Sequence, residues 1–437
     1  MRKLLSKLVR GQISRREFAR RMAGLGFGSL TVGSILDTVD LGQGENKAKA
    51  ASHSEAFRFQ PFSETSPYEQ WMAGEGVPIY TGYHVPDVRS LELKPWQRLG
   101  ARGALIHLEG AEVTDGAYVC EIAPGASTAP QRFLFEETIY ILDGAGETTV
   151  WHDPRRKQTI RWQKGTLFAP PLNVWRKHFN RGQTPARFVS VTDAPLLMDL
   201  FHNPSFIFNN DFVFSDRYNN EPDYFAVNPS KVRKAGSAAI FGEGERGSIS
   251  VLDTGLIPDI HNLELYEARA RGVTNKSAEL FLSDNSMQTH VSEFGVGTYK
   301  RAHRHGPGSH ILVLGGIGYS LMWTETPRYS EAPKQVRIDW KDGALFVPPD
   351  RWFHQHFNAG GSPTKYMATS WVGSKYFVKA LGGGGRTHRL NLVSTKQGGN
   401  MIDYPDEDPA IRSIFEEELR KNGVTIRMPS AGQGRLK

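Results

Sequence analysis

Short apolar or alternating runs, each a few residues long, recur along the chain from about residue 85 onward. The clearest of them occupy residues 117–122, 137–142, 147–151, 188–192, 289–294, 310–314, 319–323 and 366–370. Gly, Pro, Asp and Asn separate these runs at intervals typical of hairpins, and a period of two residues indicates strands with one face buried. The pattern therefore predicts an all-β fold made of many short strands.

Only the end of the chain carries a clear helical pattern. Asp408-Pro409 is a typical helix start and Asn422-Gly423 a typical stop. Between them, four apolar residues share one stripe at helical spacing: Ile411, Ile414, Phe415 and Leu419. We expect one short C-terminal helix.

Two segments of the chain are repeated. VPDVRSLEL at 85–93 matches IPDIHNLEL at 257–265, and GTLFAPPLNVWRKHFN at 165–180 matches GALFVPPDRWFHQHFN at 343–358. Eight of the sixteen positions in the longer pair are identical, so chance does not explain the match. We expect a first domain at 51–200, a crossover at 201–245, a second domain at 246–400 and a helical extension at 401–437. The aromatic segment 201–225 is expected to be ordered and to pack on both halves.

The first fifty residues resemble a twin-arginine export signal. Ser14, Arg15, Arg16 and Phe18 form its core, a weakly apolar segment follows at 22–36, and 48–50 reads Ala-Lys-Ala. This resemblance implies recognition by the twin-arginine export machinery, cleavage after Ala50 and a periplasmic mature protein. The apolar segment is shorter than the roughly 20 residues of a membrane span, so no span is expected in the mature protein.

The charge balance changes once this segment is set apart. The chain has a net charge of +7, but residues 1–50 hold ten Lys/Arg and four Asp/Glu and account for +6 of it. The remaining residues, with 43 basic and 42 acidic side chains, are nearly neutral, which gives no electrostatic reason to expect nucleic-acid binding. Cys120 is the only cysteine, so an intramolecular disulfide and a multi-cysteine metal site are excluded, and its place in an apolar run predicts a core residue.

Four histidines of the second copy have a spacing that suits metal binding. His303 and His305 are two residues apart, so on a strand both imidazoles face the same side. The turn at 306–309 is expected to reset the alternation and bring His310 inward, and His354 arrives from a strand distant in sequence. Imidazole ligands favour Fe, Zn, Cu or Ni over Mg or Ca. The prediction is one divalent transition metal bound by His303, His305, His310 and His354.

These residues resemble the two motifs of the cupin superfamily. The first motif is a glycine, five residues, His-x-His, an acidic position and a glycine, here at Gly297, His303, His305, His310 and Gly316. The second is a glycine, a proline, a histidine and an asparagine, here at Gly343, Pro349, His354 and Asn358. The resemblance covers both copies and implies a bicupin, with two tandem double-stranded β-helix barrels.

The first copy lacks this ligand set. Gln131, Phe133, Thr138 and Arg176 stand where the second copy has its four histidines, so a degenerate, metal-free barrel is expected. His178 persists in this copy opposite His356, which indicates a structural role for both, such as bonding a backbone group.

The histidine at position 310 distinguishes the chain from oxalate decarboxylases and other manganese bicupins, which have glutamate there. His-Arg-His at 303–305 and the W-x-H-x-H-x-N character of 352–358 resemble the gentisate and salicylate ring-cleaving dioxygenases, which implies Fe(II), O2 and a small anionic phenolic or enol acid as substrate. Mn, Cu, Ni or Zn remain alternatives to iron. A manganese lyase and a non-catalytic periplasmic metal or ligand carrier are alternative functions. No catalytic residue is assigned, and a homo-oligomer is left open.

Overall fold

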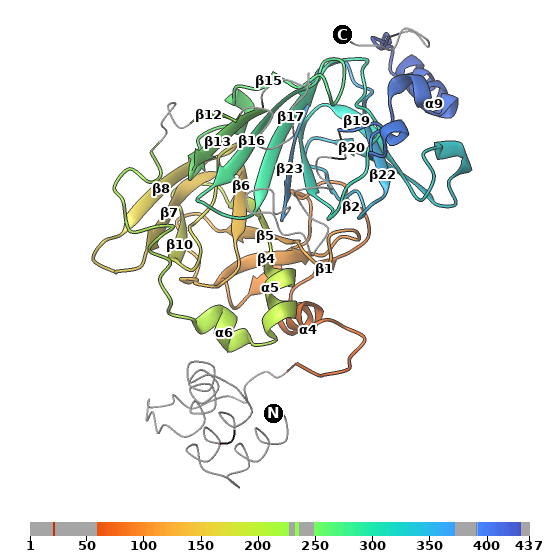
Figure 1. Cartoon of the computed structure of the whole chain (residues 1–437). Helices are drawn as coiled ribbons and strands as arrows, with labels where there is room; N and C mark the ends of the chain where they lie inside the picture. Colours follow the sequence, from red (N-terminus) through yellow and green to blue (C-terminus); the bar gives the residue numbers. More distant parts are fainter. Residues whose placement is uncertain are drawn as a thin grey trace. The chain divides into compact units, whose positions relative to one another are not determined.

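The computed structural model describes residues 59–226, 232–235, 249–371, 390 and 392–429, together with Arg21 (Figure 1). The chain divides into two units, residues 1–57 and 58–437, and the second holds the elements described below. The predicted export segment lies outside the described residues apart from Arg21. No helix in the described part is long and apolar enough to cross a membrane.

The first barrel is formed by a large sheet and a small sheet. The large sheet has the order β1-β4-β5-β11-β6-β9-β14, with β3 beside β4, and the small sheet has the order β10-β7-β8. Its own strands are β1 (Ile79–Tyr80), β3 (Lys94–Trp96), β4 (Ala101–Ile106), β5 (Gly116–Ile122), β6 (Glu137–Asp143), β7 (Ala145–Trp151), β8 (Gln158–Gln163), β9 (Leu167–Phe168), β10 (Trp175–Asn180) and β11 (Ala186–Thr192).

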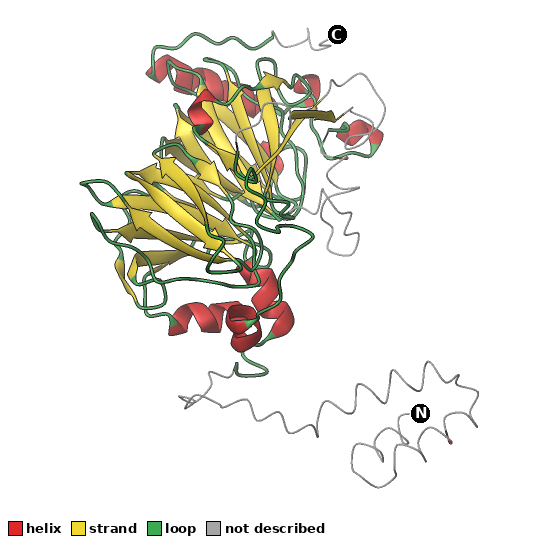
Figure 2. Ribbon diagram, turned by 90° about the vertical axis from the view of Figure 1, so that its left-hand side faces the viewer, coloured by secondary structure: helices red, strands yellow, loops and turns green. Residues whose placement is uncertain are grey.

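The second barrel repeats this arrangement. Its large sheet runs β12-β13-β16-β17-β23-β18-β21-β2, with β15 beside β16, and its small sheet runs β20-β19-β22. Its own strands are β12 (Val232–Ala235), β13 (Ile249–Thr254), β15 (Tyr266–Glu267), β16 (Lys276–Leu282), β17 (Gln288–Phe294), β18 (His310–Gly315), β19 (Ile317–Trp323), β20 (Gln335–Lys341), β21 (Leu345–Phe346), β22 (Phe353–Asn358) and β23 (Thr364–Ser370). The expected all-β fold of two tandem barrels is confirmed (Figure 2).

The repeated segments exchange strands between the two barrels. β2 (His84–Val85) pairs with β21 of the second barrel, and β14 (Leu256–Ile257) pairs with β9 of the first. The backbone N–H of Val88 then donates to the Gly343 carbonyl, as the N–H of Ile260 donates to the Gly165 carbonyl. The repeated segments therefore form two equivalent strands, β2 and β14, and each adds an edge strand to the large sheet of the other barrel.

A shared apolar core lies between the two large sheets. It includes Val119 and Val191 from the first barrel with Val291 and Leu312 from the second, all nearly inaccessible to solvent. Separate clusters fill each barrel. Because burial of apolar surface is the main stabilising term in folding, this common core binds the two halves into one unit.

The helices lie at the edges of the sheets (Figure 2). The predicted C-terminal helix is present as α9 (Pro409–Lys421), with Asp408 as its N-cap and Ile411, Phe415 and Leu419 buried. Three helices were not expected: α4 (Pro67–Gly74), α5 (Ala194–Phe201) and α6 (Pro204–Asn209). Short 3-10 turns add η3 (Ile260–Asn262), η4 (Tyr329–Glu331), η6 (Thr395–Gln397) and η7 (Tyr404–Asp406). The segment predicted as a crossover is ordered over 201–226, and its buried residues Ile207, Tyr218 and Phe225 join the first barrel's core.

Candidate metal centre

Three of the four predicted ligands come together inside the second barrel. His303 and His354 form an antiparallel bridge in which each backbone N–H donates to the other's carbonyl, at 3.1 and 2.9 Å. This bridge places the two rings 4.4 Å apart, and the ring of His305 lies 5.5 and 5.0 Å from them. One nitrogen of each ring lies within 4.8 Å of the others, so the group can hold a metal ion.

Backbone carbonyls set the orientation of these rings. Nδ1 of His303 lies 3.1 Å from the Arg301 carbonyl and Nδ1 of His354 lies 3.2 Å from the Trp352 carbonyl. A carbonyl accepts only from a protonated nitrogen, so Nε2 of each ring is left with its lone pair, as metal ligation requires. Burial lowers the pKa of His305 to about 4 and the pKa of His303 and His354 well below the usual value. The three imidazoles are therefore neutral at physiological pH, and the donor set fits a divalent transition metal.

His310, the fourth predicted ligand, lies outside this group. It is the first residue of β18, where Ser309 and Ile311 line the cavity and His310 points to the opposite face. Its side chain is buried, and neither ring nitrogen has a hydrogen-bond partner in the described part of the chain. Burial, with a smaller effect from the charge of His107 in the first barrel, lowers its pKa to about 3. The expectation that the turn brings His310 inward is wrong, because its neighbours Ser309 and Ile311 face the cavity and successive residues of a strand face opposite sides.

His356 and His178 have equivalent structural contacts. Nδ1 of His356 lies 2.8 Å from Ser320 Oγ, and Nδ1 of His178 lies 2.7 Å from Thr148 Oγ1. In each barrel an indole N–H, that of Trp340 or Trp162, donates to the same hydroxyl. Both histidines are thus held by a side-chain hydroxyl rather than by the backbone group that was expected.

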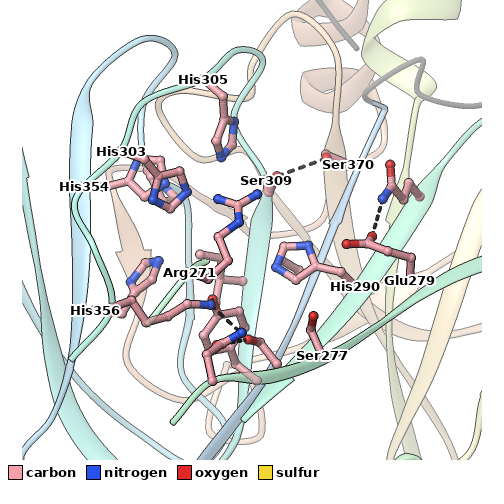
Figure 3. A pocket seen from close by; sticks show the side chains of 18 residues that line it. Arg271, Ser277, Glu279, His290, His303, His305, Ser309, His354, His356 and Ser370 are labelled. Carbon is pink, nitrogen blue, oxygen red and sulfur yellow. Dashed lines mark hydrogen bonds between the residues drawn. The ribbon is translucent and has the colours of Figure 1, made fainter. Parts of the chain in front are cut away.

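The triad opens on a narrow cavity of about 50 Å³ whose other walls carry charge. Arg271, from the loop after β15, extends into this cavity with its guanidinium below His305 and between the other two ligands and His290 (Figure 3). Its positive charge further lowers the pKa of His303 and His354. None of the described carboxylates forms an ion pair with Arg271.

Lys300 is a second basic residue on the cavity wall. Its Nζ donates to Ser292 Oγ at 2.9 Å and to Tyr366 Oη at 2.6 Å, and burial holds its pKa well below the usual value. The acidic lining residue is Glu279, whose carboxylate accepts from the Gln288 amide. Sequence reasoning missed this lining. The sequence does contain a signal for it, because polar residues alternate with apolar ones in the strands at 276–282 and 288–294. These polar residues face the cavity instead of solvent.

In the first barrel an ion pair takes the place of the ligand set. Gln131 and Arg176 form the bridge that corresponds to the bridge between His303 and His354. Nε of Arg176 lies 2.6 Å from Glu137 Oε1, each side chain is 2% exposed, and the Tyr118 hydroxyl donates to the other oxygen of Glu137. The described part of this barrel holds no histidine, cysteine and carboxylate group suited to a metal. Cys120 is buried, as expected.

Comparison with known proteins gives structural similarity alone. No family model and no curated protein matches the chain. Among solved structures, an oxalate decarboxylase variant from Bacillus subtilis shares 12% identity, with 66% of this chain and 76% of that chain covered and a TM-score of 0.41. The Lactobacillus farciminis oxalate decarboxylase in its formate complex shares 14% identity over 72% and 92% of the two chains, with a TM-score of 0.43. The fold of two tandem barrels described above is established by the chain's own strand pairing.

Proposed function

We propose that this chain is an exported metal-dependent oxygenase that uses O2 on a small anionic hydroxy or enol acid. The observation that carries the proposal is the buried triad of His303, His305 and His354, which contains no carboxylate. It opens on a cavity that holds the guanidinium of Arg271, with which no described carboxylate forms an ion pair. Three protein ligands leave coordination positions for a substrate, as in catalytic metal sites.

Charge favours an anionic substrate. Three neutral imidazoles leave a divalent ion with its full positive charge, and the guanidinium of Arg271 adds one more positive charge to the cavity. Fe(II) is the metal we propose, because imidazole suits it and because it supplies the redox chemistry between substrate and O2. The acidic lining residue Glu279 is directed to Gln288, so an anion in this cavity meets mainly positive charge.

The lining residues have separate parts in this scheme. Arg271 binds the carboxylate of the substrate, since a guanidinium matches a carboxylate with two parallel hydrogen bonds. Lys300 and Tyr366 are hydrogen-bonded to each other and provide a place where a proton can be held beside the substrate. The cavity has room for only a few water molecules, at roughly 10–15 Å³ each, which restricts the substrate to a few heavy atoms or requires its walls to move.

The same small volume favours a second candidate, a metal-dependent lyase that releases CO2 from a short diacid. Such a substrate fits the cavity without rearrangement, whereas a phenolic ring does not. The two candidates differ in one measurable quantity: the oxygenase consumes O2 in step with substrate, and the lyase releases CO2 without net O2 uptake.

The test is oxygen uptake and CO2 release by the Fe(II)- and Mn(II)-loaded protein with a panel of short hydroxy, enol and dicarboxylic acids. We expect stoichiometric O2 uptake with at least one acid and the Fe(II) form. Arg271→Gln should then raise KM roughly tenfold or more, because a charge-assisted pair is lost. The matched control Arg269→Gln, at an exposed position two residues away, should leave KM unchanged. CO2 release without O2 uptake would favour the lyase, and binding without turnover would favour a carrier.

A further inference from the structure

A second cavity, the outer cavity, adjoins the metal centre on the side of His305. Its volume is about 530 Å³, within the range of roughly 300–1,000 Å³ typical of small-molecule sites, whereas the inner cavity beside the triad has about 50 Å³. His305 lines both cavities, and it is the one ligand of the triad that is not fully buried. The metal centre is therefore closest to solvent on the side of the outer cavity.

The first barrel supplies one wall of the outer cavity. The turn at 110–114, between β4 and β5, lies against the loops of the second barrel that precede β18 and β22. The backbone N–H of Gly308 donates to the Gly110 carbonyl at 3.2 Å. A side chain at Gly110 would clash with Pro349, and one at Gly308 would clash with that carbonyl, so both positions need glycine for this close approach. The turn is thus fixed beside the metal centre although it belongs to the other barrel.

The charged side chains of the outer cavity balance one another. Two are basic and two are acidic: Arg304, Arg351, Glu112 and Asp350. Nε of Arg304 donates to the Asn400 amide oxygen at 3.2 Å, and Nε of Arg351 lies 3.9 Å from Asp350 Oδ2. Glu112 accepts from a backbone N–H two residues earlier at 2.6 Å. Unlike the inner cavity, the outer cavity therefore offers no excess of positive charge to a second carboxylate.

Apolar side chains form the rest of the contact surface that matters for a ligand. They are Ala111, Val113, Leu196 and Pro307. Val113 is 66% exposed, so most of its apolar surface is in contact with water. Removal of such surface from water is favourable, and an uncharged hydrocarbon body in the outer cavity provides it.

We propose that the outer cavity binds the uncharged body of a monocarboxylic acid whose acid head reaches the metal. This inference rests on the proposed function, from which it takes that the metal binds an anionic acid. The inner cavity has room for the acid head alone, and the body lies against Val113 and Leu196. The first barrel, which lacks the metal ligands, thus selects the substrate of the second. Such a substrate is larger than a short diacid and carries one carboxylate.

Acid binding to the Co(II)-loaded protein, followed through the visible spectrum of the metal, tests the proposal without turnover. The probes are glycolate, mandelate and malate. They share a 2-hydroxy acid head, to which mandelate adds a phenyl ring and malate a second carboxylate. We expect mandelate to bind roughly tenfold or more tighter than glycolate, because its ring is buried in the outer cavity. Malate should gain much less than mandelate.

A substitution that fills the outer cavity should remove this preference. Val113→Trp should reduce the advantage of mandelate over glycolate at least roughly fivefold and leave glycolate binding unchanged. The matched control is Val213→Trp, because Val213 is 44% exposed and lines neither cavity, and it should leave all three affinities unchanged. Leu196→Trp, from α5, repeats the test if Val113→Trp does not fold, as judged by circular dichroism.

The outcomes separate this inference from the proposed function. Equal affinities for glycolate and mandelate would refute the inference alone, since the metal would still bind an acid. The inference is also wrong if folded Val113→Trp or Leu196→Trp keeps the full preference for mandelate, or loses glycolate binding to the same extent. Failure of all three acids to bind would contradict the proposed function together with the inference.

Discussion

Replacement of His310 by leucine should stabilise the protein and leave its metal in place. The imidazole is 1% exposed, and both ring nitrogens lack partners in the described residues. An unsatisfied buried polar group costs about 1–3 kcal/mol. Leucine removes that cost and adds apolar contact on the face that His310 shares with Leu312 of the common core. We expect the free energy of unfolding to rise by about 1–2 kcal/mol. The gain is smaller than the full cost of the unsatisfied imidazole because leucine has to fit a site shaped for a ring.

The assay combines urea unfolding with metal analysis by mass spectrometry on the same preparations. His354→Leu is the matched control, because it makes the same substitution at a residue of the triad. That variant should lose the metal, whereas His310→Leu should retain one ion per chain. Loss of metal from His310→Leu, or a fall in stability comparable to that of the control, would show that His310 is a ligand and would refute the reasoning from strand phase.

Two further predictions concern buried charges outside the metal centre. Arg176→Leu should lower the free energy of unfolding in urea by roughly 3–5 kcal/mol, because it leaves Glu137 buried without its ion-pair partner. Adding Glu137→Leu should recover most of this loss. A loss below about 1 kcal/mol for Arg176→Leu would contradict the buried ion pair. Burial raises the pKa of Asp115 to about 7, so its contribution to stability is full below its unfolded pKa near 3.9 and is lost as the pH rises through 7. Relative to Asp115→Asn, the wild type should lose on the order of 3–4 kcal/mol of unfolding free energy between pH 4 and pH 8. If the stabilities of the two proteins change in parallel with pH, the pKa of Asp115 is not raised in the folded protein.

Patterns of period two predicted the strands and the internal repeat predicted two similar domains, while the resemblance to the cupin motifs implied that each is a barrel. Capping residues and an apolar stripe at helical spacing predicted the C-terminal helix. The repeat at 85–93 and 257–265 also marks the strand exchange, but nothing in one sequence says to which barrel a two-residue strand will pair. The helices α4 to α6 were missed although the Ser66–Glu69 capping box is visible, because each is too short to show an apolar stripe.

The metal centre was predicted in part, and its limits have physical causes. His303, His305 and His354 follow from motif spacing. His310 was misplaced because a one-residue change in strand phase moves a side chain to the other face, and the turn before β18 decides that phase. Arg271 and Lys300 were missed because closure of the barrel brings them to the cavity from separate elements, and neither belongs to a local motif.

Metal content per chain tests the central claim most directly. Purified protein should contain one divalent transition metal, and His303→Ala and His354→Ala should each reduce it to a small fraction, since both remove a ligand of the same ion. Gln131→Ala, at the equivalent position of the first barrel, should leave the content at one. Two ions per chain with one lost in Gln131→Ala, or full retention of metal in His303→Ala, would contradict the assignment of the metal centre to the second barrel.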